Sequence, residues 1–342
     1  MLDFTSALYL GMQHPSAALG HWPALTLGRP AALQPPPGER ALAQALARLQ
    51  RCEAATLLPS TLHLFWDLFG MLASMRVAIL IDDSAYPIAR WGAERAHALG
   101  ASLQLFPRGA VQVVAQLAQR AKNCGRRPVI LADGYCPGSN RLPPLAAYAR
   151  IALDCAGYVM LDDTQALGLF GPGGGGSLPR HGLAGEHIIV GASLAKAFGA
   201  PLAVLSGSAA LLRRFDACSQ TRRHASPPSV AAIRAASHAL QVNRDCGDVL
   251  RQRLWQRVAQ WQRAVADLGM RSSGGRFPVQ TLHMDGVVDA LALHARLARE
   301  GIATVLQMAG NKTAISFLLR ADHSAADIDR AMAALEHHLE AA

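Results

Sequence analysis

Short apolar runs alternate with longer segments between residues 54 and 208, and the apolar residues of the longer segments recur every three or four positions. The runs have the length of strands, and the segments between them have the period of amphipathic helices. Strands separated by helices predict a mainly parallel sheet with helices on both faces. The expected strands cover residues 54–59, 77–82, 103–107, 128–133, 158–163, 187–193 and 201–208.

The pattern changes after about residue 215. A long helix is expected over residues 248–269, followed by strands at 277–284 and 314–320 and by helices at 289–300 and 325–340. This order is typical of an α+β domain. We therefore expect an N-terminal arm (1–39) with a proline-rich stretch, a large α/β domain with a seven-stranded type of sheet (40–215), and a smaller α+β domain (216–342).

The composition excludes several other classes of protein. With 342 residues, of which 51% are apolar, the chain can bury a substantial core. The net charge of +9 comes from dispersed arginines, which favours attraction for anionic small molecules over a nucleic-acid interface. The six cysteines have no metal-like spacing, so we expect no metal site and no disulfides. No secretory signal and no membrane span are evident, which predicts a cytoplasmic protein.

Lysine is scarce in this chain, which has only Lys122, Lys196 and Lys312. Lys196 lies in the small-residue sequence GASLAKAFGAP, just beyond an expected buried strand. Burial there would lower the pKa of the amine and make it nucleophilic toward an aldehyde, as a Schiff base requires. Taken alone, Lys196 equally fits a lysine that snorkels from a helix start.

Asp162 changes that balance because it ends a neighbouring strand, YVMLDD. Pyridoxal phosphate (PLP) chemistry needs a carboxylate that keeps the pyridine nitrogen protonated. Asp162 fits this need at the strand edge where ligands gather in open α/β sheets. A helix cap or a loop salt bridge is the structural alternative, and it suits Asp163 better.

Two stretches carry a family resemblance. LDDTQALGLFGPGGGGS resembles the D-D-A-H-x-x-G-x-x-G-x-x-G-R-G-S motif of the PLP-dependent α-oxoamine synthases, and IIVGASLAKAFG resembles their cofactor-lysine motif. DFTSALYLGMQHP is similar to the family's N-terminal S-x-x-Y-L-G-L-x-x-H-P sequence. This family includes 8-amino-7-oxononanoate synthase and 2-amino-3-ketobutyrate CoA ligase. The resemblance covers most of the chain and implies the fold type I of PLP enzymes, as in aspartate aminotransferase.

The resemblance implies a role for each matching residue. Lys196 would form the Schiff base with PLP, and Asp162 would pair with the pyridinium nitrogen. Tyr86 stands where the family stacks a histidine on the cofactor ring. The phosphate would contact Ser193, Ser60 and Thr61, the last two at a helix N-terminus.

Other positions depart from the family pattern. Gln165 replaces the motif histidine near the cofactor's phenolic oxygen and cannot act as an acid or base. Ser316 stands where the family has an arginine that grips the substrate carboxylate, so the bidentate anchor is missing. The candidates for a replacement anchor are Arg320, Arg276, Arg222 and His224, each of which also fits a structural role.

Three functions remain open at this point. The first is an α-oxoamine synthase-like transferase that condenses an amino acid with an acyl thioester, on coenzyme A or a carrier protein. The second is an aminotransferase acting on an amine or an atypically anchored amino acid. The third is a non-catalytic protein that keeps the fold, which the substitutions at Gln165, Tyr86 and Ser316 permit. The resemblance also implies a homodimer.

Overall fold

The computed structural model describes residues 1–137, 142–284, 289–309 and 312–340. The chain divides into two compact units. The larger unit contains residues 14–136 and 142–245, and the smaller one contains residues 1–13 together with the described residues from Cys246 onward.

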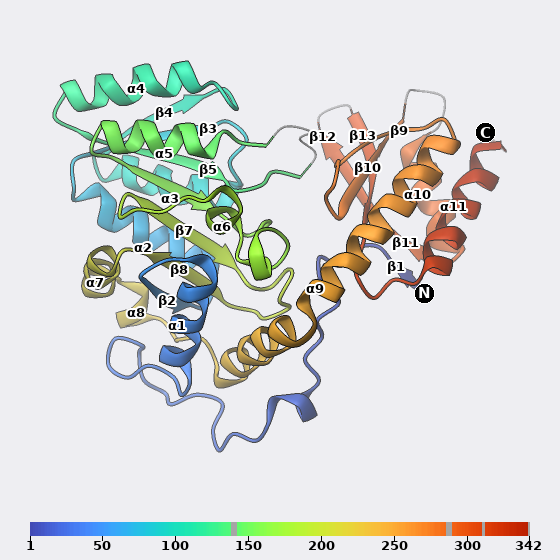
Figure 1. Cartoon of the computed structure of the whole chain (residues 1–342), viewed down its shortest axis with the longest axis horizontal. Helices are drawn as coiled ribbons and strands as arrows, with labels where there is room; N and C mark the ends of the chain where they lie inside the picture. The colour runs from blue at the N-terminus through green and yellow to red at the C-terminus, as the bar shows by residue number, and fades with distance from the viewer. Residues whose placement is uncertain (138–141, 285–288, 310–311, 341–342) are drawn as a thin grey trace. The chain divides into compact units, whose positions relative to one another are not determined.

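The larger unit is built on a seven-stranded sheet with the order β2-β8-β7-β6-β5-β3-β4 (Figure 1). All neighbouring strands from β7 to β4 pair in parallel, and β8 is antiparallel to both β2 and β7. The mainly parallel sheet expected from the sequence is therefore confirmed. The strands are β2 (Ala54–Leu58), β3 (Val77–Asp82), β4 (Ser102–Phe106), β5 (Arg127–Asp133), β6 (Tyr158–Asp162), β7 (Ile188–Ser193) and β8 (Ala203–Gly207).

Helices cover both faces of this sheet (Figure 1). Alternate residues of each strand point to opposite faces, so Ile79 and Ile81 pack under α2, α3 and α7, whereas Leu80 packs under α4 and α5. Both faces are buried over the central strands, which explains why these strands are mainly apolar, whereas the edge strand β4 is partly exposed. The helices are α1 (Glu39–Gln50), α2 (Thr61–Ala73), α3 (Pro87–Ala98), α4 (Val111–Asn123), α5 (Leu145–Asp154), α6 (Ser177–His181), α7 (Ala209–Cys218) and α8 (Thr221–His224).

The smaller unit is α+β, as the sequence predicts. It has a four-stranded antiparallel sheet with the order β12-β13-β10-β9 and a short parallel pair, β1 with β11. Phe4, Phe277 and Phe317 are fully buried in its core. Its elements are β1 (Leu2–Asp3), β9 (Arg271–Ser273), β10 (Val279–His283), α10 (Ala290–Arg299), β11 (Ile302–Ala303), β12 (Val305–Ala309), β13 (Lys312–Leu318) and α11 (Ala325–Glu340).

The boundary between the units differs from the one expected at residue 215. It falls after Asp245, inside a 38-residue helix, α9 (Val230–Asp267), which begins well before the expected residue 248. The first half of α9 buries Ile233, Ala236 and Leu240, so it belongs to the core of the larger unit. Residues 1–13 are not part of a separate arm, because β1 pairs with β11 of the smaller unit.

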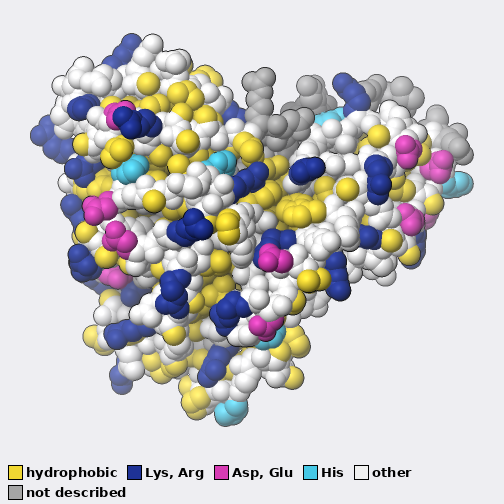
Figure 2. Space-filling view, viewed as in Figure 1, with side chains coloured by type: hydrophobic (Ala, Val, Ile, Leu, Met, Phe, Trp, Pro, Cys, Tyr) yellow, Lys and Arg dark blue, Asp and Glu magenta, His cyan; other side chains and the backbone are white. Residues whose placement is uncertain are grey.

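Basic side chains outnumber acidic ones and are spread over the face seen in Figure 2. No helix among the described residues is long and apolar enough to cross a membrane.

Candidate active site

Six strands of the large sheet have their carboxyl ends at the same edge. β3, β4, β5, β6 and β7 run in parallel, and β2 runs the same way because β2 and β7 are both antiparallel to β8. Ligands of open α/β sheets bind at this edge. The last residues of these strands, or the segments that follow them, contain Ser60 and Thr61 (β2), Tyr86 (β3), Asp162 and Gln165 (β6), and Ser193 and Lys196 (β7).

Lys196 lies in a tight turn after β7, and no helix begins there. The N–H of Gly199 donates to the carbonyl of Lys196 at 3.1 Å, and the N–H of Ala200 donates to the carbonyl of Leu194 at 3.0 Å. A lysine that snorkels from a helix start is therefore not what the structure shows. The turn holds the backbone of Lys196 at the carboxyl edge of the sheet.

Burial lowers the pKa of Lys196, while the carboxylates of Asp162 and Asp133 raise it by a smaller amount. A lowered pKa increases the fraction of free amine at neutral pH, which is the form that attacks an aldehyde. The ammonium group also faces the Tyr86 ring, with 6.0 Å between Nζ and the ring centroid.

Asp162 is 5% exposed at the end of β6. Burial raises the pKa of this carboxyl, and the opposing influences are the hydrogen bonds from Thr164 and the positive charge of Lys196. The Thr164 N–H donates to Oδ1 of Asp162 at 3.1 Å. The site therefore contains a buried carboxylate that a nearby cation stabilises, which is what a protonated ring nitrogen would require.

Asp163 has a different function from Asp162. Its Oδ2 accepts a hydrogen bond from the N–H of Ser177 at 2.9 Å, and Oδ1 accepts one from the Ser177 hydroxyl. Burial raises the pKa of Asp163 to about 6, and the Ser177 hydrogen bonds oppose this shift. A Cβ added at Gly176, which has φ +88°, would lie 2.0 Å from Oδ2 of Asp163. Asp163 thus anchors the end of the glycine-rich loop, in agreement with the structural alternative.

The remaining cofactor candidates lie at the same edge. Ser60 precedes the first turn of α2, its Oγ is 2.9 Å from Nδ1 of His63, and Thr61 begins the helix. Ser193 ends β7, and its N–H donates to Oγ1 of Thr164 at 3.0 Å. Gln165 is partly buried in the turn after β6. The first N–H groups of a helix have no intrahelical acceptor and attract anions, so the start of α2 suits a phosphate.

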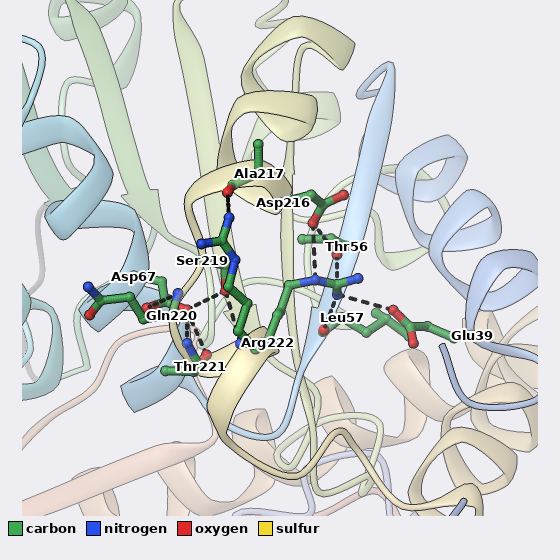
Figure 3. Close-up of polar contacts among 11 residues, drawn as sticks. Glu39, Thr56, Leu57, Asp67, Asp216, Ala217, Ser219, Gln220, Thr221 and Arg222 are labelled. Atoms are coloured by element: carbon green, nitrogen blue, oxygen red, sulfur yellow. Dashed lines mark hydrogen bonds and ion pairs between the residues drawn. The ribbon is translucent and has the colours of Figure 1, made fainter. Parts of the chain in front are cut away.

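Arg222 lies in a polar network within the larger unit (Figure 3). Its guanidinium is 3.3 Å from Oε1 of Glu39 and 3.3 Å from Oδ1 of Asp216, and it donates to Oγ1 of Thr56 at 2.9 Å. Burial raises the pKa of Glu39 and of Asp216, which the charge of Arg222 opposes in both cases. To bind a substrate, Arg222 would have to leave the buried carboxylate of Glu39 and the half-exposed carboxylate of Asp216.

The loop before Arg222 is fixed from its other side by Asp67 of α2 (Figure 3). The hydroxyl of Thr221 donates to Oδ2 of Asp67 at 2.6 Å, the N–H of Thr221 donates at 3.0 Å, and the Ser219 hydroxyl donates to the same oxygen. His224 ends α8 and is exposed. These hydrogen bonds join the loop to α2, and His224 is the anchor candidate of this segment that is exposed.

The candidate residues in the smaller unit differ in the hydrogen bonds and ion pairs that they make with other side chains. Arg320 is 3.1 Å from Oδ2 of Asp3 and 2.9 Å from Oδ1 of Asp322. Ser316 is fully buried on β13, and its hydroxyl is 2.7 Å from Oγ1 of Thr281 on β10. Arg276 is exposed. Arg320 and Ser316 thus have protein partners of their own.

Sequence reasoning missed Asp133, Thr164 and the pair His14–His238. Asp133 ends β5 in the same way as Asp162 ends β6, so the strand-end signal was present in PVILAD. His14 Nε2 is 2.8 Å from the carbonyl oxygen of Phe198, in the Lys196 turn, and its Nδ1 is 3.0 Å from Nδ1 of His238. Contacts between segments this far apart in the chain have no local sequence signal.

The described part of the chain contains no group of three or more His, Cys, Asp or Glu side chains that could hold a metal ion. The six cysteines are free thiols.

No protein-family model matches the chain. The chain is 28% identical over 230 residues to the 8-amino-7-oxononanoate synthase of Thioalkalivibrio sulfidiphilus, which covers 65% of this chain and 58% of that protein. It is 29% identical over 227 residues to the 8-amino-7-oxononanoate synthase of Halorhodospira halophila, which covers 64% and 56%. The chain thus spans a little over half the length of these relatives, and they confirm the resemblance expected from the motifs.

Solved structures show the same fold over nearly the whole chain. The 8-amino-7-oxononanoate synthase of Francisella tularensis superposes with a TM-score of 0.81 at 16% identity, covering 99% of this chain and 98% of that one. The serine palmitoyltransferase of Sphingomonas wittichii gives a TM-score of 0.86 at 15% identity, covering 98% and 86%. The expected fold type I is therefore confirmed.

Proposed function

We propose that this chain is a PLP-dependent transferase similar to the α-oxoamine synthases, which condenses an amino acid with an acyl thioester. The observation that carries the proposal is the arrangement of Lys196, Asp162 and Tyr86 at one edge of the sheet. The amine has a lowered pKa, a buried carboxylate lies close enough to influence it, and an aromatic ring faces it.

The residues at this edge fit PLP in three chemical respects. Lys196 offers an amine with a lowered pKa for the aldehyde. Asp162 offers a buried carboxylate for a protonated ring nitrogen. The N-terminus of α2 with Ser60 and Thr61 offers N–H groups and hydroxyls for a phosphate dianion.

When bound, PLP supplies an aldehyde for the amine and a pyridinium ring that accepts electron density from the α-carbon of the substrate. Lys196 would hold the cofactor and, once displaced by the substrate amine, its free ε-amine would take up the proton from the substrate α-carbon. Asp162 would accept the hydrogen bond of the ring N–H and keep that proton in place. The exposed face of Tyr86 would stack on the ring and shield it from water.

A second candidate function is an aminotransferase that acts on an amine or on an atypically anchored amino acid. It is favoured because this chain lacks the arginine that binds the substrate carboxylate in the family. The side chain at the family's arginine position is Ser316, which is buried and paired with Thr281. Arg320 is paired with Asp3 and Asp322. An α-carboxylate would therefore need a different cation in this chain, whereas an amine without a carboxylate would need none.

The cofactor assignment is tested by the absorbance spectrum of the purified protein with PLP, before and after borohydride. We expect a visible band that reduction removes, together with a mass increase on the peptide that contains Lys196. Lys196→Ala is the matched variant and should show neither change. A wild-type protein that stays colourless with excess PLP would overturn the cofactor assignment and favour the non-catalytic interpretation.

The reaction type is tested with amino donors in the absence of a thioester. The condensing enzyme should leave the cofactor in the pyridoxal form after incubation with amino acids alone. Conversion to pyridoxamine phosphate without a thioester would instead support the aminotransferase.

We also propose that the protein is a cytoplasmic homodimer. Trp66 on α2 and Trp91 on α3 are 44% and 54% exposed, and such surface aromatic residues are typical of protein interfaces. Light scattering should give twice the mass of the 342-residue chain, and Trp91→Glu should shift the protein toward the monomer. A wild-type monomer at micromolar concentration would contradict the homodimer.

A further inference from the structure

Asp133 and Asp162 form a pair of neighbouring carboxyl groups. They are register partners on the parallel strands β5 and β6. Residues in register on adjacent strands point to the same face, and those two positions earlier, Leu131 and Met160, both pack in the core under α2 and α3. Both carboxyl groups therefore lie on the face of the sheet that α2 and α3 cover.

Asp82, which ends the next strand along the sheet, is not part of this pair. Its strand neighbour Leu80 packs in the core on the opposite face, so by alternation the Asp82 side chain lies on that face. Its Oδ1 accepts a hydrogen bond from the N–H of Ser84 at 3.0 Å and another from the Ser84 hydroxyl. Among the carboxyl groups that end the described strands, only Asp133 and Asp162 are register partners on this face. The charge of Asp82 still adds to the raised pKa of Asp133, and the charge of Arg108 opposes it.

The two carboxyl groups have unequal surroundings. Asp162 accepts the N–H of Thr164 and is stabilised by the charge of Lys196. Asp133 is partly exposed, and its Oδ1 accepts the N–H of Tyr86 at the longer distance of 3.3 Å. Burial, with the charge of Asp162 adding to it, raises the pKa of Asp133 to about 8. Two adjacent carboxyl groups resist simultaneous ionisation, so the pair holds one proton near neutral pH. The shorter hydrogen bond from Thr164 and the stronger influence of Lys196 favour the anion at Asp162, which leaves this proton to Asp133.

The family has a histidine where this chain has Gln165, and an amide can donate a hydrogen bond but has no titratable proton. Gln165 therefore supplies no acid or base at this edge. We propose that Asp133 is a further functional residue of the site, a carboxylic acid that donates a hydrogen bond to an anionic oxygen of the bound cofactor or substrate. This inference rests on the proposed function. Its partly exposed position between Tyr86 and Asp162 leaves the carboxyl accessible to such a ligand.

Asp133 also has a purely structural alternative, in which it only holds the Tyr86 N–H. Asp133→Asn separates the two roles, since an asparagine can accept that N–H and donate through its amide at every pH. If Asp133 only accepts the Tyr86 N–H, its ionisation does not weaken that hydrogen bond. The wild type should then bind PLP at high pH at least as well as the Asn variant does. A donor is lost on ionisation, so the wild type would weaken relative to the Asn variant as the pH rises through 8.

The first measurement is PLP affinity of the full chain from pH 6.5 to pH 9, by quenching of tryptophan fluorescence. We expect the ratio of wild-type to Asp133→Asn dissociation constants to rise roughly fivefold to tenfold across this range, the value of one hydrogen bond. Asp133→Ala should bind more weakly than Asp133→Asn at pH 6.5. A ratio that stays constant with pH would overturn the proposal.

The second measurement needs no cofactor, namely the unfolding equilibrium of the full chain without PLP. Because the pKa of Asp133 is raised in the native state, stability should fall as the pH rises from about 4 to 8 and level off above, by up to tenfold in the unfolding constant per pH unit. Asp133→Asn should remove this part of the pH dependence, whereas Asp154→Asn, at an exposed carboxylate, should not. Identical profiles for wild type and Asp133→Asn would overturn the inference.

The two measurements also separate this inference from the proposed function. If the protein binds no PLP, the proposed function fails, and the inference fails with it whatever the unfolding profile shows. If borohydride fixes PLP on Lys196 but Asp133→Asn leaves both pH profiles unchanged, the function stands and the role of Asp133 is refuted.

Discussion

Nζ of Lys196 lies 6.0 Å from the centroid of the Tyr86 ring, while the backbone N–H of Tyr86 donates to Asp133 at 3.3 Å. Tyr86 therefore connects the segment after β3 with the ends of β5 and β7. Its position before the first turn of α3, with Pro87 as the first helical residue, fixes the backbone from which the ring projects. Tyr86 as a residue is 52% exposed and is accessible to a ligand.

The effect of replacing Tyr86 on PLP affinity should depend on whether the new side chain has an aromatic ring. Tyr86→Phe keeps the aromatic face, so we expect the dissociation constant to stay within about threefold of wild type. Tyr86→Ala removes the face and should weaken binding by roughly tenfold, corresponding to about 1.4 kcal/mol. Equilibrium titration with PLP measures both. Equal affinities for the Phe and Ala variants would contradict a stacking role.

Replacing Asp162 should change the reactivity of Lys196 even without a cofactor. Asp162 raises the pKa of Lys196 against the lowering due to burial, so Asp162→Asn should lower that pKa further. Asp133, relieved of the charge of Asp162, ionises more readily and offsets part of this effect. The free-amine fraction at pH 7.5 then increases, and labelling of Lys196 by trinitrobenzenesulfonate should become about twofold to tenfold faster.

The scarcity of lysine makes this measurement direct, because mass spectrometry needs to separate only three peptides. Lys122, which donates to the carbonyl of Asp154, serves as the internal control and should be labelled at the same rate in both proteins. A Lys196 rate that is unchanged or lower in Asp162→Asn would show that the charge of Asp162 does not reach the amine.

The fold and the central residues could be predicted because their signals are local. Strand length, helical period and the position of a polar residue at a strand end suffice to bring Asp162 and Lys196 to one edge. The same reasoning applied to PVILAD would have included Asp133, which was overlooked because no motif drew attention to it.

What the sequence could not predict depends on contacts between distant segments. Arg222 looked like a candidate anchor, but its partners Glu39 and Thr56 lie more than 160 residues away in the chain. Likewise, the pairing of β1 with β11 places the first residues in the smaller unit, and two-residue strands have no recognisable pattern. The start of α9 was missed because its first half is rich in alanine and continues past the change of unit.

The glycine-rich loop should be sensitive to a single methyl group. A Cβ at Gly176 would lie 2.0 Å from Oδ2 of Asp163, whereas one at Gly182 would meet nothing within 4 Å. Gly182 is in the left-handed helical region (φ 63°, ψ 28°), so Gly182→Ala should cost about 1 kcal/mol, whereas Gly176 (φ 88°, ψ −156°) is in a region that is less accessible still to alanine. Gly176→Ala adds both this larger backbone strain and the displacement of a buried carboxylate, and should cost about 2–4 kcal/mol. Urea unfolding gives both values, and equal losses would show that the loop relaxes freely around Asp163.

Arg222 should contribute to stability and not to substrate binding. Arg222→Met leaves the buried carboxylate of Glu39 without its cation, and Oε2 of Glu39 already has no hydrogen-bond partner; Asp216, which is half-exposed, loses its cation too but keeps contact with water. Removing one member of a buried ion pair costs about 3–5 kcal/mol, so the variant should unfold at a much lower urea concentration. Arg223→Met, at the exposed neighbour, should change stability by less than about 1 kcal/mol.

Removing the negative charges of Glu39 and Asp216 as well tests whether the loss of stability comes from their unpaired charge. The triple variant Arg222→Met, Glu39→Gln, Asp216→Asn no longer buries an unpaired charge, so it should recover a large part of the lost stability. Kinetics at a temperature where Arg222→Met remains folded complete the test. A stable Arg222→Met protein with a KM raised tenfold or more would show that the guanidinium leaves its network to hold the substrate, and would restore Arg222 as the missing carboxylate anchor.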